Sequence, residues 1–182
     1  MRLYRQGMRT GVQRGFSLVE LLIAMTISGI LIAGLTTGIV QVMVSNAGSI
    51  AHMTAVKEVE NAVHWLSRDA EMAQTINGNN VSSFNITPVP FSSANLSMSW
   101  NNEFPYNSNN ISSVTYSVAG GALQRSFTTQ GEPPSITIIV PHLGASNWGF
   151  SGNFSFNITA NISGFRPASE TRTITVLPRI IR

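Results

Sequence analysis

The sequence of 182 residues contains no cysteine, a single aspartate and only 10% charged residues, against 43% hydrophobic ones. The absence of cysteine excludes a disulfide scaffold, a thiolate metal site and a cysteine nucleophile. It does not identify the compartment, because exported proteins can also lack thiols. The hydrophobic share excludes a disordered tail and is sufficient for one ordinary domain with an appendage.

Positive charge is concentrated at the N-terminus. Arg2, Arg5, Arg9 and Arg14 lie within the first 15 residues, which contain no acid. The rest of the chain contains the other seven basic residues and all eight acids, so its side chains sum to a charge of −1 although the formal net charge of the whole chain is +3. This balance excludes a domain-wide basic face for nucleic-acid phosphates. The arginines instead suggest a targeting function.

A long apolar run follows these arginines. Residues 16–44 contain one charged side chain, Glu20, and no charged side chain occurs from Leu21 to Val56. About 20 apolar residues suffice to span a bilayer as a helix. Three ordinary interpretations are a buried core helix, a secretory signal peptide cleaved near residues 45–47, and a simple membrane anchor. The run is long for a buried core helix, and it exceeds the ~7 to 15 apolar residues of a signal peptide. A simple membrane anchor leaves the costly carboxylate of Glu20 unexplained.

The head of this run reads GFSLVELLIAM from Gly15 to Met25. It resembles the N-terminus of type IV pilins and of the pseudopilins of type II secretion. The resemblance implies that a membrane-embedded prepilin peptidase cleaves after Gly15 and methylates the new amine of Phe16. It also implies that Glu20 pairs with the cationic N-terminus of a neighbouring subunit and fixes the axial register during assembly.

The arginines also predict the orientation, because basic residues remain on the cytoplasmic side. We therefore expect a single-pass protein of the bacterial cytoplasmic (inner) membrane with its C-terminal part exported. Its expected partners are the prepilin peptidase, other pilins or pseudopilins in a filament, and membrane lipid. Gly34 and Gly38 have the GxxxG spacing that permits close helix packing, and the same glycines equally suggest a weakened helix. Many pilins have a proline in this zone, where this chain has Thr36 and Thr37.

A helical pattern continues beyond the apolar run. Apolar residues recur at spacings of three and four, which predicts one buried stripe, while Lys57, Glu58 and Glu60 take other faces. The predicted stripe consists of Val56, Val59, Val63, Leu66, Ala70 and Ala73. The segment Asn77-Gly78-Asn79-Asn80 is expected to end the helix at Ile76. A helix over 16–76 would be about 90 Å long at ~1.5 Å per residue.

Residues 77–182 have strand patterns. Strict alternation of apolar and polar residues over 154–163 predicts a strand with one wet face. Two segments around Gly120-Gly121 predict a hairpin. About seven antiparallel strands packed on the helix are expected, with further strands at 96–100, 136–140 and 173–177. The predicted fold class is α+β and pilin-like: a leader over 1–15, a membrane half over 16–44, an amphipathic stalk over 45–76 and an exported β domain over 77–182.

Catalytic and ligand-binding patterns are weak. His52 and His64 lie on the same predicted helix and His142 has no acid nearby in sequence, so a serine-hydrolase triad has no support. Glu103, Glu132 and Glu170 lie in separate loops, so their spacing says nothing about glycoside chemistry. The Asn101-Asn102-Glu103 cluster and Asn107–Asn110 offer only one carboxylate for calcium. Asn-x-Ser/Thr triplets on the alternating strand are explained by its polar face. We expect no catalytic residue, metal or cofactor.

Two function classes remain. The first is a structural subunit, a minor pilin or pseudopilin that is inserted, cleaved and assembled into a type IV pilus or type II secretion pseudopilus. The second is a pilin-stemmed binding module, an adhesin or DNA-uptake receptor at the filament tip. Residues 62–73, taken with Tyr116 and Leu123-Gln124-Arg125, are loosely similar to minor pilins of the J and W type.

Overall fold

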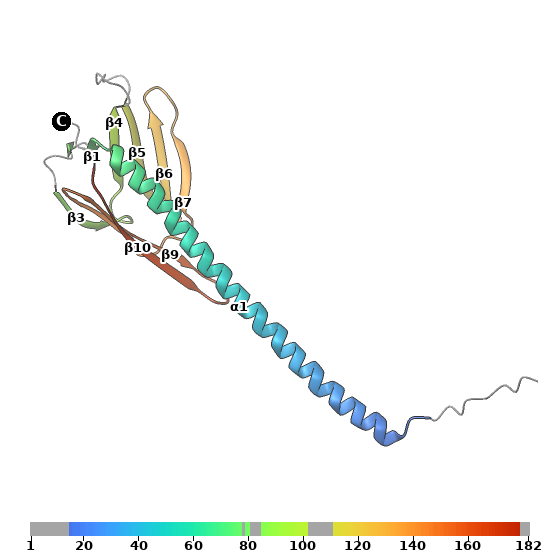
Figure 1. Ribbon diagram of the computed structural model, residues 1–182. Helices are drawn as coiled ribbons and strands as arrows, with labels where there is room; N and C mark the ends of the chain where they lie inside the picture. The colour runs from blue at the N-terminus through green and yellow to red at the C-terminus, as the bar shows by residue number, and fades with distance from the viewer. Residues whose placement is uncertain (1–14, 78, 81–84, 102–110, 179–182) are drawn as a thin grey trace, which may run out of the picture. The chain divides into compact units, whose positions relative to one another are not determined.

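The computed structural model describes residues 15–77, 79–80, 85–101 and 111–178 (Figure 1). These residues belong to two compact units that divide between Met43 and Val44. The first unit contributes the N-terminal part of a single long helix, and the second contributes the rest of that helix with all the described strands. The leader arginines, Asn102, Glu103, Asn107–Asn110 and the C-terminal Arg179–Arg182 lie outside the described residues.

Helix α1 spans Leu18–Met72 and is 55 residues long. It begins two residues after Phe16 and ends at Met72, before Ile76, which the sequence pattern predicts as its last residue. The predicted end is wrong because Thr75 and Ile76 form a short strand that pairs with Ser99 and Met98. Both residues are β-branched, and such side chains favour a pleated strand once a partner is present.

The ten strands in the described part of the chain form two antiparallel sheets. The first has the order β2-β1-β4-β5-β6-β7 and the second the order β10-β9-β8-β3. The fold class, α+β with a long N-terminal helix and antiparallel strands, is confirmed. The strand bounds are β1 Thr75–Ile76, β2 Asn79–Asn80, β3 Asn85–Pro90, β4 Leu96–Asn101, β5 Ile111–Ala119, β6 Ala122–Thr129, β7 Ser135–Val140, β8 Asn147–Ser151, β9 Phe154–Ile162 and β10 Ala168–Val176.

The hairpin of β5 and β6 is the one that the Gly-Gly pair predicts. Gly120 has a φ of 60° and Gly121 a φ of 78°. Two consecutive residues with positive φ are what a two-residue type I′ turn requires, and glycine adopts them without steric cost. The strands then pair in continuous register from Ala119 with Ala122 to Ser112 with Thr129. This register places Tyr116 directly opposite Arg125.

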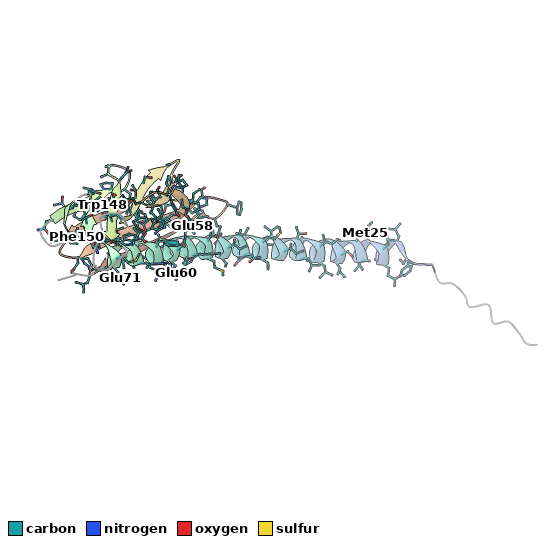
Figure 2. The ribbon with its side chains drawn as sticks, turned by 90° about the horizontal axis from the view of Figure 1, so that it is seen from above. Met25, Glu58, Glu60, Glu71, Trp148 and Phe150 are labelled. Atoms are coloured by element: carbon teal, nitrogen blue, oxygen red, sulfur yellow. The ribbon has the colours of Figure 1, made fainter. Side chains whose placement is uncertain are left out.

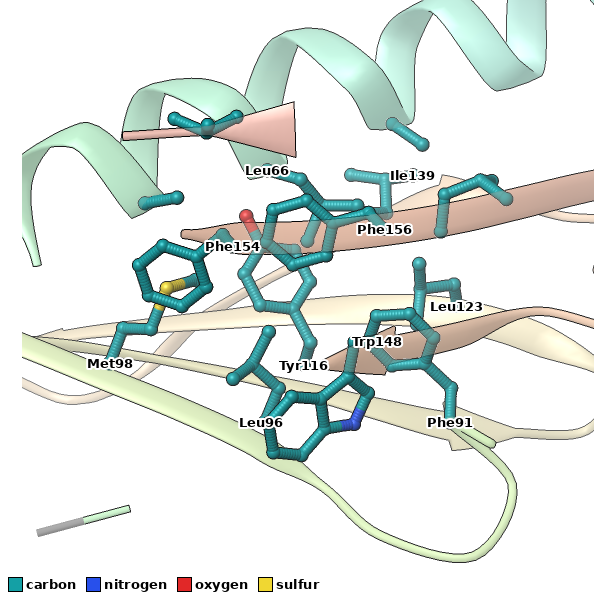
Figure 3. Packing of buried hydrophobic residues seen from close by; sticks show 14 of the residues in the cluster. Leu66, Phe91, Leu96, Met98, Tyr116, Leu123, Ile139, Trp148, Phe154 and Phe156 are labelled. Carbon is teal, nitrogen blue, oxygen red and sulfur yellow. The ribbon is translucent and has the colours of Figure 1, made fainter. Parts of the chain in front are cut away.

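One hydrophobic cluster in the second unit joins α1 to both sheets (Figure 3). Leu66 comes from α1, Tyr116 and Leu123 from the first sheet, and Phe154 and Phe156 from the second. The alternation along β9 is confirmed from Phe154 to Ala160, where the apolar residues are buried and the polar residues between them are partly exposed. The helix and the strands therefore cover each other's apolar faces.

The buried stripe of α1 differs in part from the predicted one. Val59, Leu66, Ala70 and Ala73 are fully buried, as predicted, but Val56 and Val63 are only half-buried. The buried face also includes Ala55, Ala62 and two acids, Glu58 and Asp69. Placing Glu58 on another face was therefore wrong. The two acids lie on the buried face because residues distant in sequence provide their hydrogen bonds.

Candidate functional site

The predicted cleavage site lies immediately before α1. Gly15, Phe16 and Ser17 have no regular secondary structure and are exposed, with 86% of the Phe16 surface accessible. A methyl group built on Gly15 would meet no atom within 4 Å. The backbone on either side of the Gly15–Phe16 bond is therefore open, as a peptidase substrate needs to be.

Glu20 lies in the first turn of α1 and faces its own N-terminal backbone. The backbone N–H of Ser17 donates to Oε2 of Glu20 at 3.3 Å, and the backbone N–H of Leu21 donates to the carbonyl of Ser17 at 3.2 Å. This is half of a capping box, in which an acid at the third helical position satisfies a backbone donor that the helix leaves free. The sequence signal that indicates this cap is Ser-x-x-Glu before an apolar run.

The first half of α1 has no buried residue from Leu18 to Met43. Met25 is an example, with 70% of its surface exposed (Figure 2). Among the described residues, α1 is the one helix that is both long enough and apolar enough to cross a membrane. A helix that is apolar on all faces needs a covering other than water.

The threonines of this segment have internal hydrogen-bond partners. The hydroxyl of Thr36 donates to the carbonyl of Ile32 at 2.8 Å, and that of Thr37 donates to the carbonyl of Ala33 at 2.9 Å. Such bonds satisfy a hydroxyl without a partner from outside the helix. The segment is continuously helical at the position where many pilins carry proline.

A buried ionic cluster links α1 to the β5–β6 hairpin. Asp69 is fully buried, and its Oδ2 accepts hydrogen bonds from the Tyr116 hydroxyl at 2.5 Å and from Nε of Arg125 at 2.7 Å. Nη2 of Arg125 donates to the other carboxylate oxygen at 2.9 Å. The guanidinium also lies over the ring of Trp65 at 4.5 Å and that of Phe127 at 5.1 Å. All of these contacts hold one charge pair away from water.

The protonation states of the cluster follow from its surroundings. Burial, followed by the charge of Asp69 and its hydrogen bond, raises the pKa of the Tyr116 hydroxyl well above its ordinary value of 10.0. Burial by itself lowers the pKa of Arg125, but the hydrogen bond and the charge of Asp69 outweigh it and the net direction is upward. Tyr116 therefore remains neutral and Arg125 cationic at physiological pH.

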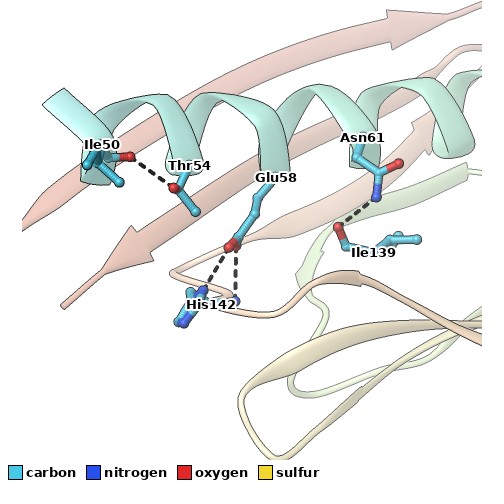
Figure 4. A network of polar contacts seen from close by, with 6 residues as sticks. All are labelled: Ile50, Thr54, Glu58, Asn61, Ile139 and His142. Atoms are coloured by element: carbon cyan, nitrogen blue, oxygen red, sulfur yellow. Dashed lines mark hydrogen bonds and ion pairs between the residues drawn. The ribbon is translucent and has the colours of Figure 1, made fainter.

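A second polar contact joins α1 to the segment between β7 and β8 (Figure 4). Oε1 of Glu58 lies 2.7 Å from Nδ1 of His142, and Oε2 accepts the backbone N–H of His142 at 3.1 Å. One turn along the helix, Nδ2 of Asn61 donates to the carbonyl of Ile139 at 3.1 Å. His142 has no acid nearby in sequence, but the fold places Glu58 beside it.

The other two histidines lie on the surface of α1. His52 and His64 are exposed, and the ring of His64 contacts the edge of Trp65 at 5.7 Å. Within the described ranges, no group of three or more histidine, aspartate or glutamate side chains could hold a metal ion. Because Glu103 lies outside those ranges, the expectation that its loop binds no metal stays a prediction.

Comparison with known proteins identifies the N-terminal motif. Residues 11–36 match the family model described as the prokaryotic N-terminal methylation motif. No curated protein and no solved structure matches the chain. The match includes Gly15, Phe16 and Glu20, and it confirms the predicted prepilin-type motif.

Proposed function

From the premise that this chain carries the N-terminal methylation motif of the type IV pilin and pseudopilin family, we propose that it is a minor pilin or pseudopilin. It is anchored by α1, processed by the prepilin peptidase and assembled with other pilins into a type IV pilus or a type II secretion pseudopilus. The observation that carries the proposal is the motif match at the head of an apolar helix. Its function is structural, not catalytic.

Processing is supported by the state of the cleavage segment. The peptidase cleaves between Gly15 and Phe16, and both residues lie outside α1 with exposed backbone. A peptide bond within a helix would first have to unfold to enter an active site. Methylation then takes place on the amine of Phe16, adjacent to Ser17, whose N–H already contacts Glu20.

Assembly is proposed to use Glu20. A carboxylate has about four acceptor positions, so the bond from the neutral backbone N–H of Ser17 leaves capacity for a cation. The mature amine of a neighbouring subunit is such a cation at the same membrane depth. Pairing lowers the free energy of both charges in a medium of low dielectric constant.

The orientation and the compartment follow from the same premise. The leader arginines remain in the cytoplasm, residues 16–44 cross the inner membrane once, and the strands from Thr75 onward are exported. The absence of any buried residue between Leu18 and Met43 supports the membrane span, since lipid or sibling helices would cover that surface.

The J and W assignment gains support from the buried cluster. Its loose sequence similarity comprises one segment containing Asp69 and another containing Tyr116 and Arg125. Tyr116 and Arg125 both donate hydrogen bonds to the carboxylate of Asp69. The two segments are therefore one packed feature, which supports treating their similarity as a single signal.

The test compares wild type, Glu20→Gln and Glu20→Leu at equal membrane abundance by crosslinking and co-purification with sibling pilins. Glu20→Leu should still insert and be cleaved, but its incorporation into filaments should fail, because a buried amine without a partner costs about 3–5 kcal/mol. Glu20→Gln, which keeps an acceptor without charge, should be intermediate. Equal incorporation of all three forms would refute the role of Glu20. Filaments that form without this subunit but no longer bind their target would favour the binding module.

A further inference from the structure

The turn between β9 and β10 lies against α1 in the second unit (Figure 1). A methyl group built on Gly48 would lie 3.3 Å from Cδ of Arg166. Farther along both elements, Nη2 of Arg172 lies 3.8 Å from Oε1 of Glu60. The hairpin of β9 and β10 therefore contacts the helix at two separate points.

These two contacts fix the direction of the hairpin along α1. From Glu60 back to Gly48 the helix rises about 18 Å at ~1.5 Å per residue. From Arg172 back to Arg166 the strand covers about 20 Å at ~3.3 Å per residue. Because the two lengths agree, the hairpin runs alongside the helix with its turn directed toward the N-terminal end of α1.

The turn is near the end of the apolar run. Gly48 follows Val44 by four residues, which is about 6 Å along a helix and under about 15 Å even for extended chain. The headgroup region of a bilayer adds roughly 5–8 Å on each side of the hydrocarbon. The chain length alone therefore keeps the turn close to the level at which the helix would leave the membrane.

The exposed residues at this level suit a membrane surface. Phe165, at the turn, is 81% exposed, and the neighbouring helix exposes Ile50 and Met53 by 58% and 72%. Arg166 is exposed, and it forms no ion pair with any of the residues that the structure describes. An exposed aromatic next to an unpaired cation is the pair that interfacial segments use to enter the headgroup region.

The helix surface changes character beyond this level. The first charged side chain after Glu20 is Lys57, and the helix exposes Lys57 and Glu60 where Arg172 packs. The exposed helix residues at the level of the turn are therefore uncharged, some apolar and some polar such as Ser49 and His52, and the charged ones lie about three turns farther from it. This gradient matches the change from bilayer interface to water.

We propose that the β9–β10 turn is a second membrane contact, in which Phe165 enters the interface of the bilayer and Arg166 binds the phosphate of anionic phospholipids. The inference rests on the proposed membrane anchoring of α1 and goes beyond it. This contact fixes the orientation of the exported unit relative to the membrane before assembly. Anionic lipid strengthens it, because the negative surface attracts a basic side chain within a Debye length.

The absence of cysteine permits a direct depth measurement on the full-length chain. Single variants Ser163→Cys, Asn153→Cys and Ala33→Cys would carry a spin label and be reconstituted into vesicles of zwitterionic lipid, with or without anionic phosphatidylglycerol. Ser163 adjoins the turn. Asn153 is the matched control, since it is exposed at the opposite end of β9, about 30 Å away at ~3.3 Å per residue. Ala33 reports on the membrane segment itself.

The expected result is that the label at position 163 is several-fold less accessible to a water-soluble relaxation agent than the label at position 153. The difference should be larger with phosphatidylglycerol and should disappear in a Phe165→Ser, Arg166→Gln background. Equal accessibility at positions 163 and 153, with position 33 protected by lipid, would overturn this inference alone. Protection of position 163 that requires sibling pilins would assign the turn to a subunit contact and would also overturn it. Exposure of position 33 would instead contradict the anchoring under the proposed function.

Discussion

The two halves of α1 differ in how their surfaces are covered. From Leu18 to Met43 the helix has no buried residue, and its apolar side chains are exposed on every face. From Val44 onward the same helix buries Ala55, Leu66 and Ala70 against strands of its own chain. The first half depends on a covering from outside the chain, and the second half is stabilised by internal packing.

The acids of the two halves show the consequence of this difference. In the first half, the hydrogen bond that Glu20 forms with the described residues is a local one, from the backbone N–H of Ser17. In the second half, Asp69 and Glu58 are buried and contact groups distant in the chain. The exposed acid of the first half can therefore bind a group of another molecule, whereas the buried acids of the second half already bind groups of their own chain.

The largest effect on stability is expected from removing the buried carboxylate of Asp69. Asp69→Ala leaves the guanidinium of Arg125 and the hydroxyl of Tyr116 buried without their acceptor, which should lower the free energy of unfolding by about 3–5 kcal/mol. Urea-dependent proteolysis of the full chain measures it. The double variant Asp69→Leu, Arg125→Met should recover much of the loss, since an apolar pair leaves no buried charge. A loss under about 1 kcal/mol for Asp69→Ala would show that the cluster is not desolvated.

A smaller loss is expected at the other buried acid. Glu58→Ala removes the acceptor of two His142 nitrogens, one of them a backbone N–H, and should cost about 1–3 kcal/mol. Glu58→Gln is the matched control, because its amide oxygen can still accept the backbone N–H. Identical stabilities of the two variants would mean that the bond to the backbone contributes nothing.

The raised pKa of Tyr116 predicts a fall in stability at alkaline pH. Above pH ~10 the unfolded chain ionises this tyrosine while the folded chain keeps it neutral, so the unfolded state binds fewer protons. The stabilisation is therefore complete below pH ~10 and falls by about 1.4 kcal/mol per pH unit above it. Tyr116→Phe should abolish this component in a comparison of unfolding free energies at pH 8 and pH 11. An unchanged slope in that variant would assign the alkaline sensitivity to other groups.

The smallest effect is expected from removing the uncovered half altogether. A chain beginning at Val44 should be soluble, show a circular dichroism spectrum of mixed helix and strand, and melt cooperatively, because its core lies within residues 44–182. Its unfolding free energy should match that of the full chain within about 0.5 kcal/mol. A disordered spectrum would mean that the first half contributes to the core.

The features predicted from sequence are those with a local pattern. The GFSLVE motif, the alternation of β9 and the Gly120-Gly121 turn are each defined by adjacent residues. Strands β3 and β8 were missed because the prolines of the former and the glycine of the latter weaken the strand pattern. Gly149 of β8 is accounted for only in the structure, where a methyl group would lie 3.2 Å from Cα of Pro88.

The buried acids were missed for a different reason. Helical periodicity counts apolar positions and therefore assigns any acid to a wet face. The partner of Glu58 lies 84 residues away and that of Asp69 lies 56 residues away, so only the tertiary fold shows the compensation. Glu20 differs from these acids because its partner in the structure is local. The family resemblance predicts its role in assembly, and the Ser-x-x-Glu capping signature that begins at Ser17 indicates the local bond.

The central claim, that this chain is matured as a prepilin, is tested most directly by the intact mass of the protein purified from cells with an active prepilin peptidase. The account predicts a single mature chain that begins at Phe16 and carries one added methyl group on its amine. Gly15→Leu should leave the leader attached. A chain beginning near residue 48 would identify a conventional signal peptide and contradict the account, as would an unprocessed chain that retains residues 1–15 while the peptidase matures sibling pilins in the same cells.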